Sequence, residues 1–160
     1  MKIARLVIAG SLLASGYAVY AKPAARPTAP SGKELINARQ AGMDMAVATL
    51  TLLRNASKNG APLKTLVFPS SGLAKWAEAV PPLFSGNTKG LPSRAKPNVW
   101  TDRAGFEAKA ADFVSATKAL AAAAAAEDKA AFDAALASTS ASCKGCHDTY
   151  QVPPPAAKPG

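Results

Sequence analysis

The chain has 160 residues, a formal net charge of +9 at pH 7 and 49% hydrophobic residues, many of them alanine. This length supports one globular core, and the alanine content favours helix over sheet. We do not expect this positive charge to bind nucleic acid, because no basic cluster is interleaved with aromatic residues. The charge indicates either a basic, solvated surface or a docking face for an acidic partner protein.

Residues 1–21 have the organisation of a secretory signal peptide. Lys2 and Arg5 form a basic start, an apolar run covers residues 6 to about 18, and small residues lead to a cleavage site after Ala21. An uncleaved anchor is the alternative, although the run is shorter than the ~20 residues that cross a bilayer. We therefore expect export to the periplasm, with no stable membrane insertion.

Composition divides the rest of the chain into three parts. A Pro/Ala-rich leader is expected at 22–31, a helical domain at 32–152 and a disordered tail at 153–160.

The first two helices are expected at 32–60 and 61–80. Ser31 can cap the first helix, and Gly60 can end it. Its core face is expected to carry Ile36, Arg39, Gln40, Met43, Ala46, Val47 and Leu50. Pro69 is expected to kink or split the second helix.

A proline-rich crossover loop is expected at 81–98, followed by two more helices. The third helix begins near Thr101 or Asp102, and a turn near residues 126–128 separates it from the fourth. The third has an apolar stripe of Phe106, Ala110, Phe113, Val114, Thr117 and Leu120, and the fourth one of Phe132, Leu136, Thr139, Cys143, Cys146 and Tyr150. Together the pattern predicts an all-α, antiparallel four-helix bundle.

Both cysteines and the only histidine lie together, in the sequence CKGCH at residues 143–147. A structural zinc site needs four ligands, and the chain offers three in this segment without a second pair. A redox C-x-x-C normally opens a helix after a strand, which is not the context here. C-x-x-C-H is the attachment signal for c-type haem, with Cys143 and Cys146 bonded to the haem and His147 on the iron.

Three segments resemble the class II cytochromes c, the family of cytochrome c′ and its low-spin, methionine-ligated relatives. They are ARQAGMDMA at 38–46, SRAKPNVWTDRAGFEAKAADF at 93–113 and CKGCHDTY at 143–150, and the resemblance covers about residues 33–151. It implies one covalently bound haem c in a four-helix bundle, with His147 as the proximal ligand. It also implies that Arg39 lies near a haem propionate and that Met43 faces the distal side of the iron.

These expectations give two hypotheses of function. The first is a periplasmic monohaem cytochrome that transfers single electrons through a His147/Met43-ligated haem and meets redox partner proteins. The alternative is a five-coordinate haem protein of the cytochrome c′ type that binds NO or CO. Under neither hypothesis is the protein an enzyme, and a homodimer is compatible with both.

Overall fold

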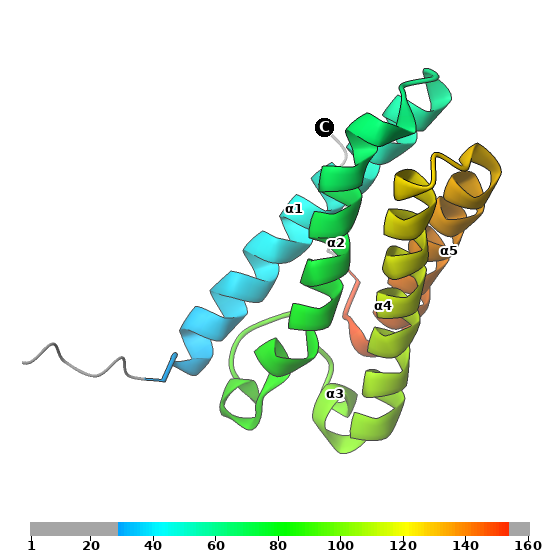
Figure 1. Cartoon of the computed structure of the whole chain (residues 1–160). Helices are drawn as coiled ribbons and strands as arrows, with labels where there is room; N and C mark the ends of the chain where they lie inside the picture. The colour runs from blue at the N-terminus through cyan, green and yellow to red at the C-terminus, as the bar shows by residue number, and fades with distance from the viewer. Residues whose placement is uncertain (1–28, 154–160) are drawn as a thin grey trace, which may run out of the picture.

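A capping box defines where the first long helix begins. The computed structural model describes residues 29–153, and α1 spans Gly32–Lys58 (Figure 1). The Ser31 hydroxyl accepts a hydrogen bond from the Glu34 amide, and the Glu34 carboxylate accepts one from the Ser31 amide. Two backbone groups without an intrahelical partner are thereby satisfied. The predicted cap at Ser31 is confirmed.

The second helix begins before its proline and continues through it. A 3-10 turn, η1, covers Leu63–Leu66, and α2 follows directly at Val67–Ala79. Pro69 therefore lies in the first turn of α2, where a backbone amide has no intrahelical acceptor to lose. The prediction that Pro69 kinks or splits this helix is wrong, because the change of helix type falls earlier, at Leu66.

The crossover between α2 and the next long helix is partly ordered into short helical turns. It contains the 3-10 turns η2 (Pro81–Phe84) and η3 (Gly86–Thr88) and ends in the single-turn helix α3 (Asn98–Thr101). The stretch expected as a loop is thus a series of turns that follows one end of the bundle (Figure 1).

Aspartate caps start both of the last two helices. In α4 (Arg103–Ala125) the Asp102 carboxylate accepts from the Gly105 amide, and in α5 (Lys129–Tyr150) the Asp128 carboxylate accepts from the Ala131 amide. Glu127, between the helices, has a φ of 55° and reverses the chain. The predicted turn at residues 126–128 is confirmed.

The four long helices form the predicted all-α bundle, in which α2 packs on both α1 and α4, and α4 packs on α5 (Figure 1). The main core contains fully buried side chains from each long helix, among them Leu53, Ala77, Leu120 and Phe132. A smaller cluster of Val99, Phe106 and Tyr150 closes the end where α5 stops.

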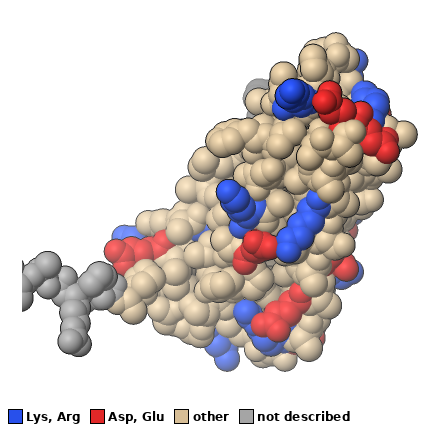
Figure 2. All heavy atoms as spheres, viewed as in Figure 1, with Lys and Arg blue, Asp and Glu red and all other residues tan. Residues whose placement is uncertain are grey.

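The described surface has mixed charge. On the face in Figure 2, Lys and Arg lie beside Asp and Glu, with wide uncharged areas between them, so this face has no single-sign docking patch. Across residues 29–153, no helix combines the length and apolarity needed to cross a bilayer. The predicted signal peptide at 1–21 lies outside the described residues, as do most of the predicted leader and tail.

Candidate cofactor site

The last turns of α5 carry the three residues of the C-x-x-C-H motif. Cys143, Cys146 and His147 are each half-buried, and both thiols are free. Burial raises the pKa of both thiols. Burial, with a further contribution from the positive charge of Arg94, lowers the pKa of His147. The imidazole is therefore kept neutral at pH 7, which is the form that binds a metal.

Two adjoining cavities of about 340 and 210 Å³ open in front of this motif. Residues from α1, α4 and α5, with one residue directly after α2, line both of them: Met43, Val80, Phe106, Cys146 and His147. The larger cavity is bordered by the polar side chains of Arg39, Gln40, Asp44, Ser93, Arg94 and Gln151. The smaller is mostly apolar and includes Ala46, Leu50, Leu73, Phe113 and Cys143. Together they form a slot with a polar mouth and an apolar interior.

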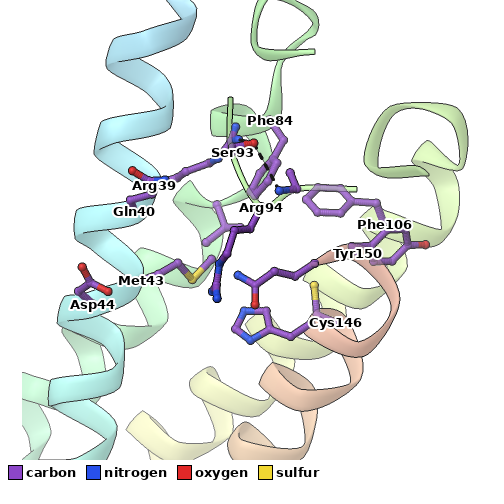
Figure 3. A pocket seen from close by; sticks show the side chains of 14 residues that line it. Arg39, Gln40, Met43, Asp44, Phe84, Ser93, Arg94, Phe106, Cys146 and Tyr150 are labelled. Carbon is purple, nitrogen blue, oxygen red and sulfur yellow. Dashed lines mark hydrogen bonds between the residues drawn. The ribbon is translucent and has the colours of Figure 1, made fainter. Parts of the chain in front are cut away.

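The α1 side of this slot holds two of the expected site residues. Met43 is half-buried and extends from α1 towards α5 (Figure 3). Met45, two positions further on, is 71% exposed and does not line the slot. Met43 is thus the one methionine within residues 29–153 that faces His147 across the cavity.

Arg39 is buried, and no carboxylate within residues 29–153 pairs with it. Its side chain is 4% exposed and donates to the Leu83 carbonyl oxygen at 3.1 Å and the Ser93 hydroxyl at 3.0 Å. The guanidinium also lies over the Phe84 ring, 4.3 Å from its centroid. Burial lowers the Arg39 pKa. A buried cation with neutral partners is costly, and an acidic group entering the slot would offset that cost.

A strap at residues 94–98, not anticipated from the sequence, holds the end of α5. Lys96 donates from Nζ to the carbonyl oxygens of Asp148 and Thr149, at 3.0 and 3.3 Å. The Lys96 amide donates to the Tyr150 carbonyl oxygen at 2.9 Å, and the Val152 amide donates to that of Arg94 at 2.8 Å. The strap satisfies carbonyls at the helix end and fixes the turn that carries His147. In the sequence, the one sign of this strap is Lys96, a basic residue next to Pro97 that can bond the free carbonyls of a helix end.

Two residues expected on the core face of α1 lie at its edge. Val47 is 64% exposed, although part of it lines the apolar cavity, and Gln40 is exposed at the polar mouth. The buried positions Ile36, Arg39, Leu50 and Leu53 set the centre of the face. Val47 and Gln40 lie to one side of that centre, so placing them in the core was wrong.

These features fit a haem. A haem is a large apolar disc with two carboxylates on one edge, and the slot has an apolar interior with the buried Arg39 at its polar end. Two thiols three residues apart on one helix, followed by an imidazole, are the donor set of c-type attachment. Within residues 29–153 no cluster of three or more Cys, His and acidic residues could hold a bare metal ion.

The bundle and this donor set define a c-type cytochrome in which the haem lies among four helices. Comparison with known proteins gives the family: the model of the family described as Cytochrome C′ matches residues 34–151. The chain belongs to the cytochrome c′ family, as the sequence resemblance predicted, and its cofactor is one covalently attached haem c.

Individual relatives agree with this family. The cytochrome c′ of Rubrivivax gelatinosus is 46% identical over 66 residues, which are 41% of this chain and 51% of the relative. That sequence match spans about half of the curated relative. The solved structure of the Rubrivivax gelatinosus protein is 29% identical, with a TM-score of 0.71, and the match covers 78% of this chain and all of the other. A ferrous variant of the Alcaligenes xylosoxidans protein with bound NO is 26% identical, with a TM-score of 0.72, over 79% of this chain and all of the other.

Proposed function

We propose that this protein binds small neutral gases, NO and CO, at a five-coordinate haem held by α5. The thiols of Cys143 and Cys146 would hold the haem covalently, each through a carbon–sulfur bond to one vinyl group, with the thiol hydrogen going to the other vinyl carbon. His147 supplies the proximal nitrogen to the iron. Arg39 pairs with a propionate at the polar mouth, and Met43 covers the distal side without bonding the iron.

The observation that carries this proposal is the apolar wall opposite His147. Four of the α1 residues that line the smaller cavity donate no hydrogen bond from their side chains: Met43, Ala46, Val47 and Leu50. The fifth, Arg54, donates to the Ser140 hydroxyl of α5. Polarity, donors and access on the distal side decide what a haem binds. NO and CO need no hydrogen bond from the protein, whereas bound O₂ is stabilised by one. The NO complex of the Alcaligenes xylosoxidans relative supports the same class of ligand.

A second candidate function is the one-electron transfer through a His147/Met43-ligated haem that the sequence also suggested. The supporting observation is that Met43 and His147 line both cavities from opposite helices. A thioether on the iron would close the distal side and raise the reduction potential. We place this second because the family match is to cytochrome c′ and the solved relatives include an NO complex.

The test uses the holoprotein and the Met43→Leu variant, which keeps the side-chain volume and removes the sulfur. We expect the wild-type haem to be high-spin by optical and EPR spectroscopy and to bind CO in the ferrous state. Met43→Leu should then leave the spin state unchanged. A low-spin wild type that becomes high-spin in Met43→Leu would instead establish the electron-transfer function.

We further propose that the protein acts in the periplasm as a haem-containing binding protein rather than as an enzyme. The signal-peptide pattern of residues 1–21 supports export. Mass spectrometry of the mature protein is expected to give a chain that begins near Lys22 with one haem added.

A further inference from the structure

A glycine on α1 lies directly against a tryptophan of α2. A methyl group built on Gly42 would overlap Cη2, Cζ3 and Cζ2 of Trp76, the three atoms at the far edge of the indole. Glycine is less favourable than alanine inside a helix, and α1 has alanines at many other positions. Gly42 is therefore the residue that lets α1 approach the flat edge of Trp76.

This contact lies beside the candidate distal residue. Gly42 immediately precedes Met43, and the two positions differ by about 100° around the helix axis. Trp76 is half-buried and packs against the main core, so it offers a firm surface rather than a mobile one. Its helix also contributes Leu73 to the apolar cavity, and Val80, directly after α2, lines both cavities. The edge of the Trp76 ring thus supports α1 at the level of the slot.

We infer that the close packing of Gly42 against Trp76 positions Met43 over the haem iron. A displacement of α1 away from Trp76 moves Met43 mainly sideways, since the two residues point about 100° apart. A sideways shift takes Met43 off the path to the iron and opens the distal side. Trp76 is then a positioning residue that acts through Met43. This inference rests on the proposed gas-binding function.

The test is a compensating pair of variants on the holoprotein. Gly42→Ala adds the methyl that meets the indole edge, and Trp76→Phe removes the ring atoms it meets. We expect Gly42→Ala to raise the association rate of CO with the ferrous haem at least about tenfold. The double variant is expected to return within about twofold of wild type. Gly72→Ala is the matched control, because Gly72 is on α2 with nothing near its Cβ direction, and its rate should equal that of wild type.

Two results would overturn the inference: a double variant as fast as Gly42→Ala, or a Gly42→Ala variant that lowers only the melting temperature. The ferric EPR spectrum gives a readout independent of gas binding and should change in Gly42→Ala but not in Gly72→Ala. If Gly42→Ala does not take up haem, the double variant is compared with Trp76→Phe, and equal rates are expected. A double variant much faster than Trp76→Phe would show that the methyl acts without the indole.

The proposed function can fail separately. A low-spin wild type would mean that Met43 ligates the iron and that gas binding is not the resting function. Gly42→Ala would still be expected to reduce the low-spin fraction if Trp76 positions Met43, whereas an unchanged fraction would overturn the positioning role.

Discussion

Arg39 and Arg94 both border the polar mouth of the slot, but their surroundings differ. Arg39 is buried and fixed by Leu83, Ser93 and the Phe84 ring. Arg94 is exposed, and its backbone carbonyl oxygen accepts a hydrogen bond from the Val152 amide. A propionate would therefore gain more from Arg39, because a charge-assisted bond strengthens when both partners are desolvated.

Replacing each arginine by methionine separates their roles. Arg39→Met is expected to cost the holoprotein about 1.5–3 kcal/mol in denaturant unfolding, the range for hydrogen bonds to charged groups. Arg94→Met should cost no more than ~1 kcal/mol, as for an exposed charge. Loss of the Arg39 charge should also lower the haem reduction potential, because a nearby cation favours the ferrous form. Equal losses in the two variants, with no change in potential, would contradict the propionate role.

The residues of the site were only partly predictable from sequence. Cys143, Cys146 and His147 form a local motif, so their association needs no knowledge of the fold. Met43 and Arg39 were selected by position on α1 and by family resemblance, and the structure brings both to the slot. The Gly42–Trp76 contact was missed, because it joins two helices whose relative rotation depends on packing of the whole bundle.

At the scale of elements, a tyrosine at the end of α5 is bonded to the start of α4. The Tyr150 hydroxyl donates to Asp102 at 2.7 Å, and its ring meets Phe106 edge-on with centroids 5.5 Å apart. Asp102 is also the cap of α4. The bond holds together the two helix ends nearest to His147.

This bond predicts a loss of stability at alkaline pH. The Asp102 hydrogen bond, with smaller contributions from burial and nearby charge, raises the Tyr150 pKa from 10.0 to about 12. The folded protein thus holds the phenol proton more tightly than the unfolded chain does. The resulting stability is complete below pH 10 and is lost as the pH rises to about 12.

Tyr150→Phe keeps the ring and removes the titrating group. Urea unfolding at a series of pH values should find the variant less stable than wild type at pH 8. The difference between them should shrink between pH 10 and about 12. A difference that stays constant over that window would contradict the role of the Tyr150–Asp102 bond.

Helix starts and the last turn were predictable because their signals are local. Ser31, Asp102 and Asp128 satisfy the first amides of their own helices. The prediction from Pro69 was wrong because the effect of a proline depends on its position within the helix. Since α2 begins at Val67, Pro69 falls in the first turn, where a proline costs no intrahelical hydrogen bond. The strap at 94–98 depends on contacts more than 50 positions apart, which no local pattern encodes.

At the scale of the whole molecule, α1 is apolar on two opposite faces. Its outer face carries a series with the 3–4 spacing of a helix–helix seam: Ala38, Ala41, Met45, Ala48 and Leu52. All five are exposed, and Met45 and Leu52 are 71% and 51% exposed. A surface helix normally turns polar side chains to this side. The small alanines allow another helix to approach closely, so this seam suits a helical partner.

A second copy of the same chain is the simplest such partner, because a two-fold axis pairs one seam with itself. We therefore predict a homodimer through α1. Ala48→Glu places two like charges near the axis and is expected to weaken the dimer at least about tenfold, or ~1.4 kcal/mol. Ala111→Glu, the same change at an exposed alanine of α4, should leave it intact. Sedimentation equilibrium of the holoproteins measures both effects. A monomeric wild type, or equal weakening by both variants, would contradict an α1 seam between two copies.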